Sequence, residues 1–486
     1  MTVVVQVRVV LRIIGALAMF FSLTMIPPLA VSLFYADGAA RPFLLGFVII
    51  LFAGVFLWWP FRHARKELRV RDGFLVVVLL WLVLGLTGAV PFALSEKPHM
   101  SFTNAVFESL SGLTTTGATV ISGLDQLPPS ILYYRQQLQW LGGMGIVVLA
   151  VAVLPLLHVG GMQLYRAETP GPMKDNKLTP RIAETAKALW AVYLGLTILC
   201  ALGYWGAGMT PFDAIGHAYS TIAIGGFSTH DASIGYFQSP LIEALAILFM
   251  MFAGINFALH FDVLRNLGTK IYLEDSEVKV YFSLLLVTTV LVCGYLIWQT
   301  NESLAENIRA GAFQSVSFMT TSGFTSTDYS RWPVFVQVLL LFSAFIGGCA
   351  GSTAGGLKVI RVILLYKQGV REILRLIHPQ AEIPVKVSRV PVPTRVVEAV
   401  WGFFALYVVS FAIIMLLMMA VGLDQITAFS AVAACLNNLG PGLGNVTAGF
   451  MTMPDSVKWL ACFAMLLGRL EIFTLLVLLA PAYWRS

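Results

Sequence analysis

Charged residues are scarce in this chain of 486 residues, where Asp, Glu, Lys and Arg together account for only 12%. A soluble protein of this size carries roughly a quarter charged residues, because its surface faces water. Hydrophobic residues make up 58% of the chain, and the mean hydropathy is +0.82. This composition excludes an ordinary soluble enzyme, a disordered chain and a nucleic-acid-binding protein, even with a net charge of +6 at pH 7. It is typical of an α-helical protein that crosses a membrane several times.

Cysteine is also sparse, and its placement argues against two kinds of site. The five cysteines lie in or beside apolar stretches, with no Cys-x-x-Cys motif and no Cys/His ligand spacing. We therefore predict neither disulfides nor a bound metal cofactor. No nucleophile, general base and metal ligands cluster along the chain, which disfavours a membrane enzyme.

Long apolar runs are abundant, and a run of about 18–25 residues crosses the hydrocarbon core as a helix. About ten such runs are present, at 10–34, 42–61, 74–94, 138–160, 188–207, 241–260, 281–299, 334–364, 397–421 and 457–483. The first is too long for the apolar part of a cleaved signal peptide, so residues 1–34 are expected to be retained. The predicted fold class is an all-α polytopic membrane protein with about ten transmembrane helices.

Lysine and arginine gather in four blocks, and such blocks remain on the cytoplasmic side of a membrane. The blocks run from Arg62 to Arg71, from Arg166 to Lys187, from Arg265 to Lys279 and from Lys358 to Arg395. A cytoplasmic N-terminus puts all four inside and, with ten spans, the C-terminus as well. The fourth block is amphipathic in part and interrupted by prolines, so it also suits a cytoplasmic connector that contacts a partner or anionic lipid.

Four polar segments between the spans repeat one pattern. They read SFTNAVFESLSGLTTTGAT (101–119), TPFDAIGHAYSTIAIGGFS (210–228), NIRAGAFQSVSFMTTSGFT (307–325) and DQITAFSAVAACLNNLGPG (424–442). Aligned without gaps, they superpose four glycines that are 109, 97 and 117 residues apart, namely Gly117, Gly226, Gly323 and Gly440. Each interval holds one complete span–segment–span unit. The sequence therefore predicts four membrane hairpins, each with a short helix and a loop at its outer end.

The repeats divide the chain into a two-helix N-terminal prefix followed by four units. The predicted boundaries are 1–71 for the prefix and 72–163, 188–264, 280–368 and 395–486 for the units. Non-helical backbone at membrane depth is tolerated only where protein or a water-filled cavity surrounds it. We therefore expect the four loops to meet on one pseudo-four-fold axis and to form a pore.

A ring of backbone carbonyls can replace the hydration shell of a cation, as in potassium channels. Glycine suits such a loop because it reaches positive φ without a Cβ penalty, and threonine tolerates extended backbone and hydrogen-bonds locally. The predicted selectivity filter comprises Thr115, Thr116 and Gly117; Ile224, Gly225 and Gly226; Thr321, Ser322 and Gly323; and Asn438, Leu439 and Gly440. The alternative is that these glycines only allow close helix packing.

The four motifs and three further stretches closely resemble the bacterial Trk potassium uptake proteins, TrkH and TrkG, of the superfamily that includes the Ktr and HKT transporters. The further stretches read GGMQLYRAETPGPMKDNKLTPRIAETAK (160–187), IGGCAGSTAGGLKVIR (346–361) and LLGRLEIFTLLVLL (466–479). The resemblance covers nearly the whole chain, including the prefix that distinguishes Trk from Ktr.

The resemblance implies a homodimer in the bacterial inner membrane with one pore per protomer, and assembly with TrkA, a cytoplasmic nucleotide-binding ring. It implies K+ as the transported ion and gives this chain no nucleotide site of its own. In the HKT branch, serine at the first filter glycine accompanies sodium transport, so four glycines favour potassium. The second loop reads IGG and is expected to contribute carbonyls only.

A glycine-rich stretch lies midway along the predicted span 334–364. Five glycines in ten residues each cost roughly 0.8–1 kcal/mol in a helix relative to alanine, so a continuous helix is disfavoured. We predict an intramembrane loop that obstructs the conduction path, and the resemblance implies the same gating role. Its residues are Gly347, Gly348, Gly351, Ser352, Thr353, Gly355, Gly356 and Lys358. The alternative is a kink that serves packing alone; a phosphate-binding loop is disfavoured because GSTAGGLK lacks the GK[ST] ending.

Arg469 lies about twelve residues into the last predicted span. An arginine at mid-membrane costs at least about 2.5–3.5 kcal/mol on insertion scales, so it should face a cavity or a partner. We predict a positive charge beside the permeation path, and snorkelling to the membrane surface is the alternative. Glu471 lies two residues further, on a different helical face, and is not an obvious partner.

The predicted function is potassium uptake through a carbonyl-lined pore, gated by the intramembrane loop and by TrkA. Broken helices and repeats also occur in secondary transporters, so K+/H+ or K+/Na+ symport by alternating access is the alternative. Asp125, Asp231 and Asp328 follow their filter glycines and either line the external mouth or are solvated loop residues. His217 is expected to hydrogen-bond within the protein rather than relay protons.

Overall fold

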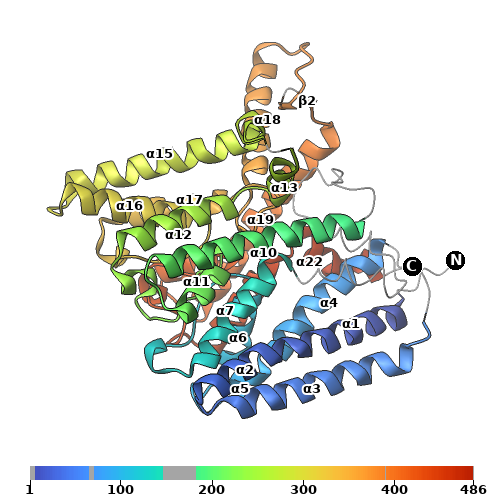
Figure 1. Ribbon diagram of the computed structural model, residues 1–486. Helices are drawn as coiled ribbons and strands as arrows, with labels where there is room; N and C mark the ends of the chain where they lie inside the picture. Colours follow the sequence, from blue (N-terminus) through green and yellow to red (C-terminus); the bar gives the residue numbers. More distant parts are fainter. Residues whose placement is uncertain (1–5, 65–69, 146–181, 267, 389, 485–486) are drawn as a thin grey trace.

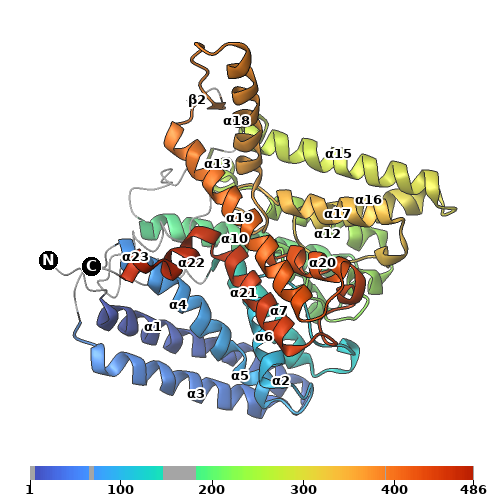
Figure 2. The same cartoon turned by 180° about the vertical axis from the view of Figure 1, so that it is seen from behind.

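The computed structural model describes residues 6–64, 70–145, 182–266, 268–388 and 390–484. Almost all regular structure in these residues is helical (Figures 1 and 2). The one sheet in the described part of the chain is a two-stranded antiparallel hairpin of β1 (Lys386–Val387) and β2 (Val390–Pro391). The all-α fold class is confirmed.

The N-terminal prefix is a helical hairpin. It consists of α1 (Val7–Ser22), α2 (Ile26–Tyr35) and α3 (Ala40–Trp58). Gly15 of α1 and Gly54 of α3 face each other, and a Cβ on Gly15 would lie 2.7 Å from the Gly54 carbonyl oxygen. The two backbones can therefore approach closely, as small residues allow in membrane helices.

Four times after the prefix, a long outer helix is followed by a short helix and then by an inner helix. The outer helices are α4 (Val70–Gly88), α10 (Ile182–Gly206), α15 (Ser276–Gln299) and α19 (Thr394–Ala420). The short helix α5 (Val90–Leu94) follows α4 directly. The short helices are α6 (Phe102–Leu113), α11 (Pro211–Ile222), α16 (Leu304–Met319) and α20 (Gln425–Leu436). The inner helices begin with α7 (Pro129–Gly143), α12 (Pro240–Ala253), α17 (Val334–Ile346) and α21 (Asp455–Arg469). The four units are called repeats 1 to 4 below; their exact boundaries stay predictions.

Each short helix starts with the same kind of cap. Ser101, Thr210, Ser303 and Asp424 accept a hydrogen bond from the backbone N–H three residues later. Such caps satisfy one of the free N–H groups at a helix start. The helix start is therefore defined locally, and the opposite, electronegative end of each helix leads into the glycine loop.

Within the described residues, six helical stretches are long and apolar enough to cross a membrane, or eight if each of two bent pairs counts as one span. The expected span 241–260 is not a single helix, because α12 meets α13 (Phe257–Asn266) at 94°. The expected span 457–483 is likewise bent by 116° between α21 and α22 (Ile472–Leu479). The run 334–364 is interrupted between α17 and α18 (Val359–Ile377), and the run 138–160 extends beyond the described residues.

Tertiary hydrogen bonds explain the bend in repeat 2. At the end of α12, the Gly254 carbonyl accepts from Cys349 N at 2.8 Å, and Phe257 N donates to the Gly351 carbonyl at 3.0 Å. The glycine-rich segment after α17 therefore satisfies backbone groups that a continuous helix would pair internally. Hydropathy shows only that these residues are apolar and does not reveal the break.

Two further α-helices are short, namely α14 (Lys270–Glu274) and α23 (Pro481–Trp484). Tyr483 donates to the Arg71 carbonyl at 2.8 Å, and Gln6 N donates to Asp72 at 3.1 Å. The first and last described helices thus lie beside the start of α4, as the prediction of both termini on one side requires.

Two clusters of buried apolar side chains surround the centre of the molecule. One joins the prefix to repeats 1 and 4, and the other lies mainly among repeats 2 and 3. Two smaller clusters include residues of the glycine loops themselves, Leu439 in one and Ile224 in the other. α18 projects away from the helix bundle together with the β-hairpin (Figures 1 and 2).

Candidate functional site

The four glycine loops have the same backbone conformation. Gly117, Gly226, Gly323 and Gly440 have φ of 79°, 77°, 78° and 96°. Two residues earlier, Thr115, Ile224, Thr321 and Asn438 also have positive φ, of 54°, 54°, 64° and 53°. Positive φ in a residue with a side chain costs of order 1–3 kcal/mol, and such strain gathers at functional sites. Thr115 and Thr321 therefore adopt the left-handed conformation and not an extended one.

The N–H groups of each loop turn back to the helix that precedes it. In repeat 1, Thr115 N donates to Gly112 at 3.0 Å and Thr116 N donates to Ser111 at 2.9 Å. The corresponding pair of bonds recurs in the other three repeats. These bonds cap the last carbonyls of the short helix, as αL caps generally do. Because two N–H groups of each loop are occupied in this way, the carbonyl oxygens of the loop are better placed to bind a ligand.

The loops form a closed ring in repeat order. A Cβ on Gly117 would collide with the carbonyl oxygen of Gly225, and a Cβ on Gly226 with that of Ser322. The ring continues from Gly323 to the carbonyl of Leu439 and closes from Gly440 to that of Thr116. Each glycine is thus needed both for its φ and for the approach of the next loop. The structure brings all twelve predicted filter residues together; their role as ion ligands stays a prediction.

Two side chains hold the ring, one from outside the predicted set and one from within it. Gln139 of α7 donates to the Gly225 carbonyl at 2.5 Å and accepts from Phe227 N at 3.0 Å. Asn438 donates to the Thr116 hydroxyl and to the Met465 carbonyl, both at 3.0 Å. The interpretation of the sequence missed Gln139. The signal available was the polar run RQQLQW (135–140), which overlaps the start of the apolar span expected at 138–160.

The eight predicted gate residues lie in or next to the segment between α17 and α18, which we call the gate loop (347–358). The gate loop runs directly below the ring. Gly355 N donates to the Thr321 hydroxyl at 2.6 Å, and Gly356 N donates to the Asn437 carbonyl at 3.2 Å. The Thr353 hydroxyl donates to the Ile222 carbonyl at 2.9 Å. The loop therefore contacts the filter turns of repeats 2, 3 and 4.

Both ends of the gate loop are fixed by one carboxylate that the sequence did not indicate. Glu277 of α15 accepts from Ala350 N at 2.8 Å and from Ile360 N at 3.0 Å. Inside the loop, the buried Lys358 ammonium donates to the Ala354 carbonyl. Hydrogen bonds to a charged group are stronger than those between neutral groups. The loop is therefore held in place by specific hydrogen bonds and not by apolar packing alone.

Arg469 lies at the end of α21 and connects repeat 1 to the gate loop. Its guanidinium donates to the Thr115 hydroxyl and to the Thr353 carbonyl, both at 3.3 Å, and to the Gly142 and Gly143 carbonyls, the latter at 3.0 Å. A bend at the helix end, with Glu471 at φ 58°, places this side chain at the ring. Glu471 forms an ion pair with the buried Arg361 at 2.6 Å.

Of the three aspartates that follow the filter glycines, two connect repeats 1 and 2 on the side predicted to be external. Asp231 accepts from Gly123 N at 3.1 Å and from Leu124 N at 3.0 Å. Asp125 pairs with His230 at 2.5 Å, and the other ring nitrogen of His230 lies 3.5 Å from Asp213. Asp328 instead pairs with the exposed Arg331 at 2.9 Å.

His217 is buried and hydrogen-bonds to the Asp213 carbonyl and the Ser228 hydroxyl, both at 2.8 Å. This agrees with the expected hydrogen-bonding role of His217 within the protein.

The pairing of His230 predicts a pH-dependent stability. Partial burial lowers the pKa of His230, but the hydrogen bonds and charges of Asp213 and Asp125 outweigh it, so the pKa is raised. A raised pKa in the folded state stabilises the protein below about pH 6.5, and this contribution is lost as the pH rises through the raised value. We expect His230→Gln to lower Tm by about 2 °C at pH 5.5 and by less at pH 9.

Thermal unfolding of the detergent-solubilised protein across this pH range measures the effect. His99→Gln is the matched control, because His99 is an exposed histidine. A difference in Tm between wild type and His230→Gln that is the same at every pH would contradict the prediction.

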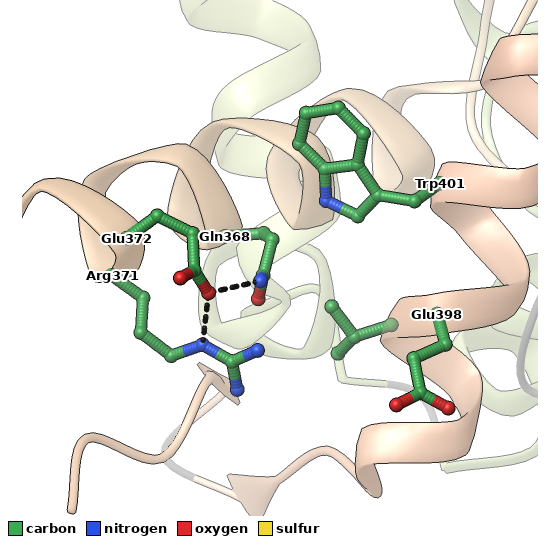
Figure 3. Close-up of a pocket in the computed structure, with 6 residues that line it drawn as sticks. Gln368, Arg371, Glu372, Glu398 and Trp401 are labelled. Carbon is green, nitrogen blue, oxygen red and sulfur yellow. Dashed lines mark hydrogen bonds and ion pairs between the residues drawn. The ribbon is translucent and has the colours of Figure 1, made fainter. Parts of the chain in front are cut away.

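A cavity of about 420 Å³ lies between α18 and α19, where repeat 3 leads into repeat 4. It is lined by Gln368, Arg371, Glu372, Val397, Glu398 and Trp401 (Figure 3). Glu372 accepts from Gln368 at 2.6 Å and lies 3.5 Å from Arg371. Beside the cavity, α18 exposes Tyr366, Ile373 and Leu376. This surface lies within the basic block predicted to be a connector.

Comparison with known proteins gives a consistent relationship. The family model TrkH, described as a cation transport protein, matches residues 40–486. The Trk system potassium uptake protein TrkH of Vibrio parahaemolyticus is 56% identical over 485 residues, which cover 99% of this chain and 100% of that protein. The TrkH of Escherichia coli K12 is 55% identical over 481 residues, covering 99% of both chains. The TrkG of the same organism is 42% identical over 482 residues, again covering 99% of both.

A solved structure agrees with these relatives. The crystal structure of the potassium transporter TrkH from Vibrio parahaemolyticus matches with a TM-score of 0.90 at 52% identity, covering 99% of this chain and 100% of that chain. The resemblance seen in the motifs is thereby confirmed. This multi-pass, all-α membrane protein therefore belongs to the TrkH family of cation transport proteins.

Proposed function

We propose that this protein takes up K+ through a pore whose selectivity filter is the ring of four glycine loops. The observation that carries the proposal is the closed ring itself, in which each glycine approaches the carbonyl oxygen of the next loop. Carbonyl oxygens can replace the water shell of K+. The electronegative ends of four short helices point toward the same ring, which favours a cation over an anion. The names of the relatives, which refer to potassium uptake, support the same ion.

The gate loop closes the pore below the filter in this proposal. Its hydrogen bonds to three filter turns, and those of Arg469 to Thr115 and Thr353, would hold it across the conduction path. The positive charge of Arg469 would also oppose the passage of K+. Opening then requires the loop to leave these contacts.

The proposed setting is the bacterial inner membrane, with both termini in the cytoplasm and a homodimer as the assembly. A cytoplasmic TrkA ring is the proposed regulator. The gate loop leads without interruption into α18, whose outer part projects from the bundle (Figures 1 and 2). A partner or anionic lipid that moves α18 could therefore pull on the gate loop. The nucleotide would bind to the partner and not to this chain.

Ion flux in proteoliposomes tests the proposal and separates it from symport. We expect currents that reverse at the Nernst potential of K+ and do not shift when a pH or Na+ gradient is imposed. Measurements with and without TrkA test regulation by the partner. A reversal potential that follows the proton or Na+ gradient would instead establish symport by alternating access.

Glu277→Ala is expected to raise the flux of K+ without TrkA. The substitution removes the acceptor that holds Ala350 N and Ile360 N, so the closed loop loses two charge-assisted hydrogen bonds. We expect a rise in flux of about tenfold, which corresponds to about 1.4 kcal/mol. Two charge-assisted hydrogen bonds together contribute more free energy than this, so their loss is sufficient. Rubidium uptake into proteoliposomes measures it.

Glu274→Ala is the control for Glu277→Ala, because Glu274 is an exposed glutamate three residues earlier in the chain. Unchanged uptake in a well-expressed Glu277→Ala variant would mean that Glu277 does not hold the gate closed.

A further inference from the structure

An ion pair is buried directly behind the ring, between repeats 1 and 2. Glu108 of the short helix α6 and Arg135 of the inner helix α7 lie 2.8 Å apart, and their side chains are 0% and 1% exposed. Two charges at this depth are costly to bury unless further hydrogen bonds satisfy them. An ionisable residue inside a membrane is therefore a functional candidate.

The further hydrogen bonds of the pair go to the two neighbouring filter loops. Glu108 accepts from Val120 N at 3.0 Å and from the Thr119 hydroxyl at 2.9 Å. Arg135 donates to the Ser228 carbonyl at 3.1 Å and to the Thr119 hydroxyl at 3.2 Å. Thr119 and Ser228 are each two residues after their filter glycine. The pair therefore holds the same point of two adjacent loops.

Further side chains of α7 extend these contacts along the second filter loop. The Arg135 guanidinium lies over the ring of Phe227 at 4.2 Å, and Gln136 donates to the Phe227 carbonyl at 3.2 Å. Gln139, one helical turn further along α7, binds the Gly225 carbonyl. The second loop is thus held on both sides of its filter glycine by side chains of the first repeat.

The ion pair is not needed for the loop conformation itself. Gln314 and Ala431 occupy the position of Glu108 in repeats 3 and 4. Those loops make the same turn, with the same pairs of positive φ angles. A carboxylate at this position therefore has a role beyond folding the loop, namely to fix loop 1 relative to loop 2.

We propose that Glu108 and Arg135 are positioning residues that fix the spacing between the first and second filter loops and thereby set the preference for K+ over Na+. This inference rests on the proposed function of the ring. Discrimination between ions of different size depends on where the carbonyls can move. Carbonyl groups in loops that Glu108 and Arg135 hold in place cannot move inward to coordinate the smaller Na+. Without these two residues, the carbonyl groups can do so.

The experiment compares single and double neutral variants of the full-length protein in proteoliposomes. Removing one member of a buried pair leaves an uncompensated charge and destabilises the protein, whereas replacing both is often tolerated. We expect Glu108→Gln and Arg135→Gln to lower both Tm and the K+/Na+ permeability ratio. In Glu108→Gln/Arg135→Gln, Tm should recover while the ratio stays reduced by about tenfold, which corresponds to about 1.4 kcal/mol.

Two further variants make the comparison decisive. Arg135→Lys retains the charge but lacks the guanidinium fork that reaches Glu108, Thr119 and Ser228 together, so an intermediate ratio is expected even if the neutral variants fold poorly. Asp328→Asn/Arg331→Gln removes an exposed pair and should leave the ratio at the wild-type value.

A wild-type K+/Na+ ratio in the double variant or in Arg135→Lys would reduce the pair to a structural role and overturn the inference. The proposed function fails by a different result, namely wild-type protein whose currents are not selective for K+.

Discussion

Gly117→Ala is expected to lower K+ flux by about tenfold or more, the equivalent of at least about 1.4 kcal/mol. The added methyl group would point at the carbonyl oxygen of Gly225 in the next loop. That oxygen cannot withdraw easily, because Gln139 holds it at 2.5 Å. The substitution therefore displaces either the first loop or the second and disturbs the ring at two places. Reversal potentials and rubidium uptake in proteoliposomes measure the loss of flux and of selectivity.

Gly38→Ala is a matched control for this prediction. Gly38 has the same φ of 79° as Gly117, but a Cβ added to Gly38 would meet no atom within 4 Å beyond its chain neighbours. Alanine is equally strained at both positions, since φ is positive at both. If both substitutions reduced flux equally, backbone strain would explain the effect and the contact between neighbouring loops would not matter.

Arg469→Ala is expected to increase basal K+ flux about tenfold, a change of about 1.4 kcal/mol in the balance between closed and open states. The variant loses hydrogen bonds to Thr353 of the gate loop and to Thr115 of the filter. It also removes a positive charge from the predicted ion path, where the local dielectric is lower than in water. Both effects act in the same direction. Uptake measured with and without TrkA would show how much regulation survives.

Arg469→Lys separates the two contributions. Lysine retains the charge but not the planar fork that reaches acceptors in repeats 1 and 3 at once. If charge dominates, Arg469→Lys should resemble wild type; if the hydrogen bonds dominate, it should resemble Arg469→Ala. Wild-type uptake kinetics in a well-expressed Arg469→Ala variant would remove this residue from the gating mechanism.

The four loops share one turn, but the groups behind them differ. Repeats 1 and 2 are connected by Glu108, Arg135 and Gln139. Gln314 and Ala431 stand at the Glu108 position in repeats 3 and 4. Below the ring, the gate loop comes from repeat 3 and Arg469 from repeat 4. Because the four repeats belong to a single chain, different residues can fix the filter loops and contact the gate loop on different sides of one pore. A pore made of four identical subunits has the same residues on every side.

Composition, apolar runs and the recurrence of four glycine motifs were enough to determine the fold class, the repeated unit and the residues of the ring. These features are encoded by neighbours in the sequence, because a cap, a short helix and a glycine turn form within about twenty residues. The glycine-rich gate loop was predictable for the same local reason, since five glycines disfavour a continuous helix.

Only the tertiary structure decided which distant groups meet. The bends after α12 and α21, and the partners of Glu277 and Arg469, involve hydrogen bonds between different repeats. Glu277 and Ile360 are 83 residues apart, and Arg469 and Gly143 are 326 apart. Such pairs have no local pattern, because the free energy that selects them arises only when the four units assemble around one axis.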